Sequence, residues 1–382
     1  MSNARGAKTW VEINAEALRN NVRNLQSLLS KDTAFCAVVK ANAYGHDLDT
    51  TVRLATLEGV DHFGVDSIDE AMQVRKRAPR AEIFILGHTV PERLEDVIAS
   101  NCIQTVYDQR VISQMLEIVL KKQKRARVNL KIETGTNRQG ISVSQLPDFL
   151  RCFKQEKRFM ELTGLSSHFA DAENAEDLSF TEQQHWRFSE AVVMAQQYDL
   201  TPRYIHIACS SAAMLIPDTL HTMVRFGIAL YGLWSSESLR RQVRLKQTLE
   251  LNPVLSWKTR IVQIKDVPSG EYIGYARSLR TKRPRRIAVL PVGYYDGYRR
   301  SFGPQGEVLV HGQRCPILGN ICMNMFMVDV SQVPKAEVGD SVTLLGRDGM
   351  HQITAENLAE IAGTINYEIP TTINPLLPRI IV

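Results

Sequence analysis

The sequence predicts an α/β protein: a parallel (β/α)8 barrel of the TIM type, followed by a mostly antiparallel β domain. Between Phe35 and Gly232, eight short apolar runs alternate with amphipathic stretches, and eight such units in roughly 200 to 250 residues are typical of this barrel. After about Arg241, apolar residues alternate or run between Pro, Gly and Asp turns, as they do in antiparallel strands. With 382 residues, the chain is long enough for two domains. We expect a barrel over residues 14–241 and a β domain over residues 242–382, together with residues 1–13.

The eight apolar runs are the predicted barrel strands, and the stretches between them are the predicted helices. Helical periodicity is clearest at Val111–Gln123 and Thr181–Gln197. A doubly wound open sheet is the alternative, but the chain has no glycine-rich GxGxxG turn to support it. The predicted strands cover Phe35–Lys40, His62–Ser67, Ile83–Gly87, Cys102–Tyr107, Arg127–Glu133, Leu162–Phe169, Tyr204–Ser210 and Met223–Gly232.

The second domain is predicted from strand patterns bounded by turn residues. One helix interrupts them at Ile353–Gly363, where Thr354 can cap the start and Gly363 can end the helix. The strand patterns are Pro253–Val267, Arg285–Tyr295, Gly306–Gly312 and Asp340–Gly346.

Composition excludes several classes of protein. The net charge of +5 is concentrated in the runs Lys121–Arg127 and Arg280–Arg286, which lack interleaved aromatic residues. Such runs are usually solvated helix ends or loops, so we expect no nucleic-acid partner. Without an apolar window of membrane length or a secretory signal, we expect a cytoplasmic protein with no membrane partner. The six cysteines are scattered and lack zinc-site spacing, which predicts reduced thiols and no metal.

Lys40 is the first candidate for chemistry. It follows the first predicted strand in the run AVVKANAYGHD (Ala37–Asp47), just before a polar turn. At the mouth of a barrel, its amine loses hydration and becomes a nucleophile able to form a Schiff base. An isolated VVK triplet would more often place the amine in solvent. The polar residues at the other strand ends favour a reactive lysine instead.

Polar residues gather at the predicted carboxyl ends of the strands, where barrel enzymes place their catalytic groups. Ser210, the Gly227 and Ile228 amides and the Tyr44 hydroxyl suit a phosphate site. A phosphate site opposite a strand-end lysine suggests pyridoxal 5'-phosphate bound through a Schiff base. The strand-end residues are Lys40, Tyr44, Lys131, Arg138, His168, Ser210, Arg225 and Gly227.

Eight blocks of sequence, taken in their order along the chain, match the sequence pattern of a known family. They are AVVKANAYGHD, LKIETGTNRQG, SSHFA, VRFGIALYG, GYARS, GYYDGYRR, CMNMFMVDV and INYEIP. In their order and spacing, the chain resembles alanine racemases, which are barrel-type pyridoxal-phosphate enzymes, over nearly its whole length. The fold prediction does not depend on this resemblance, whereas the predicted reaction does.

The resemblance implies two catalytic bases, Lys40 on one face of a planar carbanionic intermediate and Tyr275 on the other. Two are needed because racemisation removes a proton from one side and returns it to the opposite side. A phenol is a weak acid, so cations or donors must stabilise its anion, and the resemblance places His168 and Arg225 there. Arg225 would also face the pyridine nitrogen; because arginine is only a donor, that nitrogen would stay unprotonated, which limits side reactions such as transamination. Without the resemblance, Tyr275 would be interpreted as a buried structural tyrosine and Arg225 as the partner of a strand-end acid.

The resemblance also assigns the substrate and cofactor contacts. Arg138 would reach the cofactor's phenolic oxygen and the substrate carboxylate, and Lys131 matches a lysine that the family often carbamylates. A carbamate is an anion that can hold the guanidinium of Arg138, whereas an ammonium would repel it. Tyr367 would touch the phosphate and crowd the side-chain pocket, and Met323 would contact the substrate through its backbone.

The β-domain residues would reach across to the barrel of a partner subunit, so the resemblance implies a homodimer with two composite sites. Tyr294 and Arg300 would lie at the pocket entrance, together with Asn324. Asn324 stands in CMNM where many relatives carry CMD, and Cys209 stands where Asn is frequent. These departures leave open the range of small amino acids that the protein accepts.

The leading functional prediction is the interconversion of L-alanine and D-alanine, which supplies D-alanine for peptidoglycan. A broad-specificity or serine racemase of the same family is the alternative. A non-catalytic pyridoxal-phosphate carrier would lack the β domain and Tyr275. A decarboxylase of this fold usually sets a carboxylate at the ring nitrogen, so Arg225 argues against it.

Overall fold

The chain forms two compact units. The structure, a computed structural model, describes residues 6–246, 248–303 and 305–382. The barrel unit comprises Leu18–Ala43 and Leu48–Asn252, and the β unit comprises Met1–Ala17, Tyr44–Asp47 and Pro253–Val382. The expected boundary at residues 241 and 242 lies inside a helix, α10 (Glu237–Lys246).

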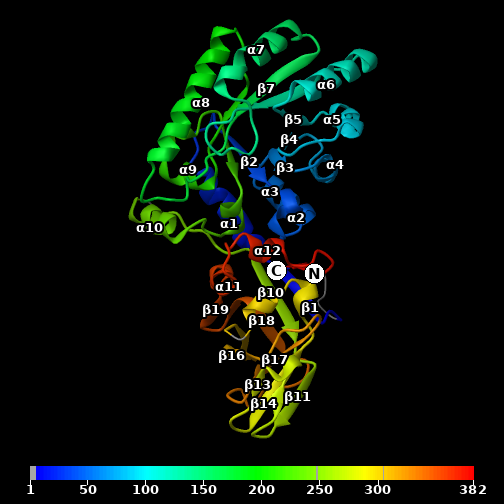
Figure 1. The fold of residues 1–382 in the computed structure, drawn as a ribbon, viewed down its shortest axis with the longest axis vertical. Helices are drawn as coiled ribbons and strands as arrows, with labels where there is room; N and C mark the ends of the chain where they lie inside the picture. Colours follow the sequence, from blue (N-terminus) through cyan, green and yellow to red (C-terminus); the bar gives the residue numbers. More distant parts are fainter. Residues whose placement is uncertain (1–5, 247, 304) are drawn as a thin grey trace. The chain divides into compact units, whose positions relative to one another are not determined.

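The barrel unit contains the predicted ring of eight parallel strands (Figure 1). The strands follow the order β8-β7-β6-β5-β4-β3-β2-β9, so each is hydrogen-bonded to its neighbour in the chain except where β2 joins β9. Across the remaining seam, isolated hydrogen bonds connect the region of β8 to that of β9, such as the bond from Thr222 N, just before β9, to Ile205 O at 3.2 Å. The predicted barrel is thus confirmed as a nearly closed ring. The strands are β2 (Ala34–Val38), β3 (His62–Val65), β4 (Glu82–Ile85), β5 (Ile103–Val106), β6 (Ala126–Lys131), β7 (Met160–Ser166), β8 (Tyr204–His206) and β9 (Met223–Phe226).

Helices connect successive barrel strands, and Figure 1 shows α6, α7 and α8 outside the strands. Helix α4 illustrates why they begin where they do: the Ser67 hydroxyl accepts a hydrogen bond from Glu70 N, a standard N-cap. Helix α1 (Ala15–Gln26) precedes the first barrel strand and α10 follows the last. Between the strands lie the short left-handed segment α2 (Lys40–Tyr44) and the helices α3 (Leu48–Leu57), α4 (Ile68–Arg77), α5 (Leu94–Ala99), α6 (Gln109–Lys122), α7 (Leu146–Gln155), α8 (Ser179–Gln197) and α9 (Ser210–Leu215).

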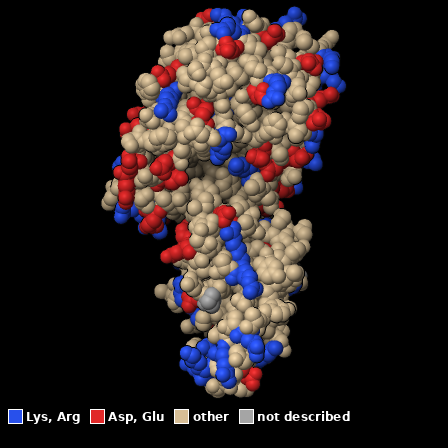
Figure 2. Space-filling model, viewed as in Figure 1, with Lys and Arg blue, Asp and Glu red and all other residues tan. Residues whose placement is uncertain are grey.

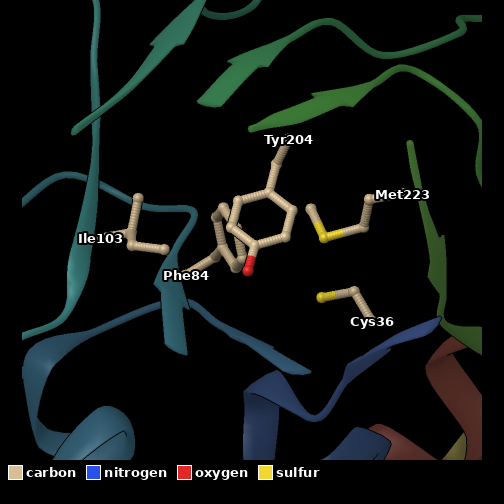
Figure 3. Packing of buried hydrophobic residues seen from close by; sticks show 5 residues of the cluster. All are labelled: Cys36, Phe84, Ile103, Tyr204 and Met223. Atoms are coloured by element: carbon tan, nitrogen blue, oxygen red, sulfur yellow. The ribbon is translucent and has the colours of Figure 1, made fainter. Parts of the chain in front are cut away.

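The barrel interior changes from apolar to polar along the strands. Cys36, Phe84, Ile103, Tyr204 and Met223 project from five strands toward one another and are buried (Figure 3). Burial raises the pKa of the Cys36 thiol to about 12, so this cysteine is not a nucleophile. Nearer the carboxyl ends the interior holds buried polar side chains such as Asn129, His206 and Arg225, at the end of the barrel where enzymes of this fold carry their catalytic groups.

The β unit contains a mostly antiparallel sheet in the order β11-β14-β17-β16-β15-β18-β10-β1-β20, with β19 paired to β18. The predicted helix is confirmed as α11 (Ala355–Ala362): Thr354 Oγ1 accepts from Asn357 N, and Gly363 ends the helix with φ of 65°. A second helix follows, α12 (Glu368–Thr371). The strands are β1 (Thr9–Ile13), β10 (Leu255–Arg260), β11 (Gln263–Val267), β12 (Tyr272–Ile273), β13 (Leu279–Arg280), β14 (Arg285–Leu290), β15 (Glu307–Val310), β16 (Gln313–Leu318), β17 (Phe326–Asp329), β18 (Ser341–Asp348), β19 (His351–Ile353) and β20 (Arg379–Ile381).

An aromatic cluster forms the centre of the β unit. The Tyr298 ring stacks on Phe326 at 4.8 Å between centroids and meets Trp257 and Phe302 edge-on at 5.5 and 4.9 Å. Among the described residues, neither the Tyr298 hydroxyl nor the Trp257 indole N–H has a hydrogen-bond partner. The cluster therefore gains packing energy and carries the cost of two buried polar groups.

The two basic runs are exposed only in part, because Arg127 lies in β6 and Arg285 and Arg286 lie in β14, where their side chains are half-buried. Lys121–Arg125 are exposed at and beyond the end of α6. Lys282 and Arg283 are exposed in the turn between β13 and β14, where Figure 2 shows lysine and arginine side chains gathered at the end of the β unit. No helix among the described residues combines the length and apolar character needed to cross a membrane.

Candidate active site

A left-handed turn follows the first barrel strand and carries Lys40. The short segment α2 does not have the backbone of a right-handed helix, because Ala41, Asn42, Ala43 and Tyr44 have φ of 54°, 52°, 54° and 54°. For L-residues other than glycine, this conformation costs roughly 1–2 kcal/mol per residue. Four in succession persist only where the surroundings hold them.

Within the barrel unit, side chains bind the backbone of this turn. The Ala41 N–H donates to Glu70 Oε1 at 2.7 Å, and the second oxygen of Glu70 accepts from Asp66 N at 2.8 Å. The Leu48 N–H donates to Asn42 Oδ1 at 2.9 Å. The turn is therefore anchored to the end of β3 and to the start of α3.

Within the β unit, the end of the turn packs against the C-terminal segment. Gly45 has φ of 83°, and a Cβ there would lie 2.0 Å from Pro370 O, so no larger residue fits. The Arg379 guanidinium donates to Gly45 O through Nη2 at 3.3 Å. The Tyr44 and Tyr367 rings lie 6.3 Å apart, which brings together two predicted cofactor contacts.

Arg225 organises the polar end of the barrel. Its Nη2 donates to Ser167 O at 2.8 Å and to His168 Nδ1 at 3.2 Å. Its Nη1 donates to His206 O at 3.0 Å and also contacts His206 Nδ1. Because arginine only donates, both histidines accept through Nδ1.

Burial and, after it, the charge of Arg225 set the protonation state of these two histidines. Burial and the nearby guanidinium hold the pKa values of His168 and His206 well below the usual range, so both rings are neutral at pH 7. A neutral ring that accepts at Nδ1 carries its proton on Nε2, and His206 Nε2 donates to Asn129 Oδ1 at 3.1 Å. The Nε2–H of His168 remains a donor.

The predicted pair Lys131 and Arg138 flanks a loop built around Glu133. The Glu133 carboxylate accepts from Gly135 N at 2.5 Å and from Arg138 N at 3.2 Å. Desolvation, with Arg225 and Arg138 nearby, holds the pKa of the Lys131 amine well below its usual range. Lys131 ends β6 and is partly buried, which excludes the plain exposed lysine, whereas Arg138 is exposed.

The predicted phosphate residues meet after β8 and β9. The Gly227 N–H donates to Ser210 Oγ at 3.1 Å. Ser210 begins α9, and Ile228 begins a 3-10 turn directly after Gly227. A hydroxyl and the first amides of two turns thus converge at one corner of the barrel mouth, where an anion would be stabilised.

The predicted β-unit residues are at its surface. Tyr275 is 71% exposed, Met323 55% and Tyr294 44%; Arg300 and Asn324 are also exposed. Backbone carbonyls of two of them are held: Asn320 Nδ2 donates to Tyr275 O at 3.2 Å, and Tyr295 N donates to Met323 O at 3.0 Å. Three of these exposed side chains are large and apolar or aromatic.

Sequence reasoning missed three residues of this arrangement. His206 and Asn129 interrupt apolar strands, and this signal could have marked them as buried polar partners. Glu70 gave only the signal of an acidic residue in the first turn of a helix, which is common.

The residues present fit a pyridoxal 5'-phosphate group. Among the described residues, the hydrogen bonds of Arg225 use Nη1 and Nη2, so Nε remains available to a ring acceptor. Ser210 and Gly227 provide an anion corner, and Lys40 provides an amine at the mouth of the same barrel.

Comparison with known proteins decides the family. A model described as "Alanine racemase, N-terminal domain" matches residues 13–235, and one described as "Alanine racemase, C-terminal domain" matches residues 254–381. An alanine racemase of Leptospira interrogans is 38% identical over 377 residues, covering 98% of this chain and 96% of that protein. The chain belongs to the alanine racemase family.

Solved structures agree with this assignment. The alanine racemase from Bacillus anthracis with bound L-Ala-P has a TM-score of 0.91 and 33% identity, covering 98% of this chain and 95% of that one. The alanine racemase from Bartonella henselae with covalently bound pyridoxal phosphate has a TM-score of 0.86 and 27% identity, covering 98% and 100%. Family membership makes the chain an amino-acid racemase, an isomerase, and confirms pyridoxal 5'-phosphate as its cofactor. The relatives are alanine racemases, so the serine-racemase alternative is not favoured.

Proposed function

We propose that the protein interconverts L-alanine and D-alanine by a two-base mechanism with Lys40 and Tyr275 as the bases. The observation that carries this proposal is the match to alanine racemases over both domains, with an amine at the barrel mouth and an exposed phenol on the β unit. The bound cofactor withdraws electrons from the substrate and so acidifies its α-hydrogen. Lys40 exchanges a proton with one face of the α-carbon through Nζ, and Tyr275 exchanges one with the other face through its phenolic oxygen.

The neighbouring residues hold the protons where this exchange needs them. Arg225 donates and cannot accept, so it keeps a facing ring nitrogen unprotonated. His168 is neutral and offers Nε2–H to a phenolate. Arg138 at the barrel mouth binds the substrate carboxylate, because a guanidinium matches a carboxylate in charge and geometry.

Lys131 is proposed to be carbamylated. Desolvation lowers the pKa of the Lys131 amine well below its usual range, so a larger share of it is neutral and able to attack carbon dioxide than for an exposed lysine. An N–C bond forms between Nζ and carbon dioxide, one amine proton passes to solvent, and the product is an anion. That anion attracts Arg138 and Arg225, whereas an ammonium would repel both.

The exposed Tyr275, Tyr294 and Met323 support a homodimer in which each β unit completes the barrel site of a partner subunit. Arg300, Asn324 and Tyr367 then belong to the same composite pocket. We place the activity in the cytoplasm, with D-alanine for peptidoglycan as its product.

Two variants test the proposal in the holoenzyme. Lys40→Ala should remove both the absorbance of the lysine–cofactor Schiff base and the racemase activity measured by chiral analysis. Tyr275→Phe should slow loss of the α-proton from L-alanine more than from D-alanine, measured as exchange with deuterated solvent. A yellow, active Lys40→Ala protein would refute the lysine assignment, and equal slowing for both enantiomers would refute the two-base assignment. A kcat/KM for serine above that for alanine would displace alanine as the substrate.

A further inference from the structure

We infer that Glu70 is a positioning residue for the cofactor site: its carboxylate selects the left-handed turn that places Lys40 and Tyr44. This inference rests on the proposed function. It starts from the four consecutive residues with positive φ directly after Lys40, a conformation that must be held by contacts elsewhere.

Glu70 supplies the contact at the first residue of the turn. Its two carboxylate oxygens accept from Ala41 N at 2.7 Å and from Asp66 N at 2.8 Å. Bonds from backbone N–H groups to a charged acceptor are stronger than bonds between neutral groups. The carboxylate therefore ties the end of β2 to the end of β3, one residue after the lysine.

An ordinary helix cap does not account for this geometry. In a capping box the N3 carboxylate would return to the N–H of the cap residue, here Ser67. Glu70 instead reaches Asp66 N, one residue earlier, and uses its other oxygen on a different strand end. Asp66 is itself fixed, since its carbonyl accepts from Gly87 N at 3.1 Å after β4. The carboxyl ends of β4, β3 and β2 are thus linked in series, and Lys40 lies at the end of β2.

The rest of the turn is anchored independently of Glu70. Asn42 Oδ1 holds Leu48 N, and Arg379 holds Gly45 O. Loss of Glu70 should therefore leave the fold intact and free only the start of the turn, where Lys40 is attached. The expected result is weaker cofactor binding and not global unfolding.

The test compares Glu70→Ala, Glu70→Gln and the control Asp69→Asn. Asp69 lies beside Glu70 in the first turn of α4 and pairs with Arg93, so its variant removes a helix-end charge without touching the turn. The readouts are the dissociation constant of pyridoxal 5'-phosphate from apoprotein, the absorbance of the Schiff base, and kcat and KM for alanine at saturating cofactor. We expect Glu70→Ala to raise the cofactor dissociation constant about tenfold or more, Glu70→Gln about threefold because one acceptor oxygen remains, and Asp69→Asn less than about twofold.

A cofactor dissociation constant within about twofold of wild type in folded Glu70→Ala would overturn the inference. If Glu70→Ala does not fold, the same limit applies to Glu70→Gln. An equal loss of cofactor affinity in Asp69→Asn would also overturn the inference, because the effect would then come from the removal of a negative charge at the start of the helix. A wild-type protein that binds no cofactor would instead overturn the proposed function, so the two failures are distinguishable.

Discussion

Replacement of His221 by Asn should flatten the pH dependence of stability between about pH 7.5 and pH 5. His221 lies just before β9, and its Nε2 is 3.3 Å from His185 Nε2 on α8. The Phe188 ring packs against it at 5.5 Å, and Asp218 acts on His185. Burial, and then the neighbouring His185, lower the pKa of His221 from 6.5 to about 4.

The sign of the effect follows from proton binding. As the pH falls from 6.5 toward 4, the unfolded chain binds a proton at His221 and the native chain does not, so the free energy of unfolding decreases. Below that window both states are protonated and the decrease is complete. A shift of this size corresponds to roughly 3 kcal/mol in full and about 2 kcal/mol at pH 5. Because His221 is only partly buried, solvent screening reduces the expected difference to about 1–2 kcal/mol.

The assay is thermal unfolding of the holoenzyme, followed by circular dichroism at about pH 7.5 and pH 5. Wild type should lose roughly 2–8 °C more than His221→Asn over this interval, at about 2–4 °C per kcal/mol for a unit of this size. Asn is chosen because His221 has φ of 45°, a conformation that Asn tolerates. The exposed His88→Asn serves as the control. Equal losses for wild type and His221→Asn would refute the argument.

Two further substitutions test buried polar groups. Lys131→Met should raise KM for alanine several-fold by removing the proposed carbamate that orients Arg138, and short carboxylic acids should partly restore it; an unchanged KM would argue against carbamylation. Tyr298→Phe should stabilise the protein by about 1 kcal/mol, because it removes a buried hydroxyl without a partner among the described residues. A lower melting temperature would show instead that the hydroxyl is satisfied in solution.

Much of the fold follows from patterns that are local in the chain. Each predicted barrel strand contains all or most of an observed strand, because a buried strand needs a short run of apolar residues and little else. The cap at Thr354 and the end at Gly363 were predictable for the same reason: both depend on side-chain chemistry within a few residues.

The candidate site was only partly predictable. Ser210 and Gly227 were expected at neighbouring strand ends, and the structure joins them by a hydrogen bond. The partners of Arg225 were not foreseen in full: His206 was missed because a histidine in a strand does not reveal which face or which neighbour it meets.

Patterns within the chain were enough to predict the alternation of strands and helices, the lysine at a strand end and the family of the chain. The fold alone shows that four residues after Lys40 turn left-handed, that Glu70 binds the first of them, and that burial together with Arg225 keeps two histidines neutral. The difference lies in how far apart in the chain the interacting residues are. Periodicity and capping act over a few residues, whereas a strained turn and a lowered pKa depend on partners distant in the chain, which only folding brings within hydrogen-bonding distance.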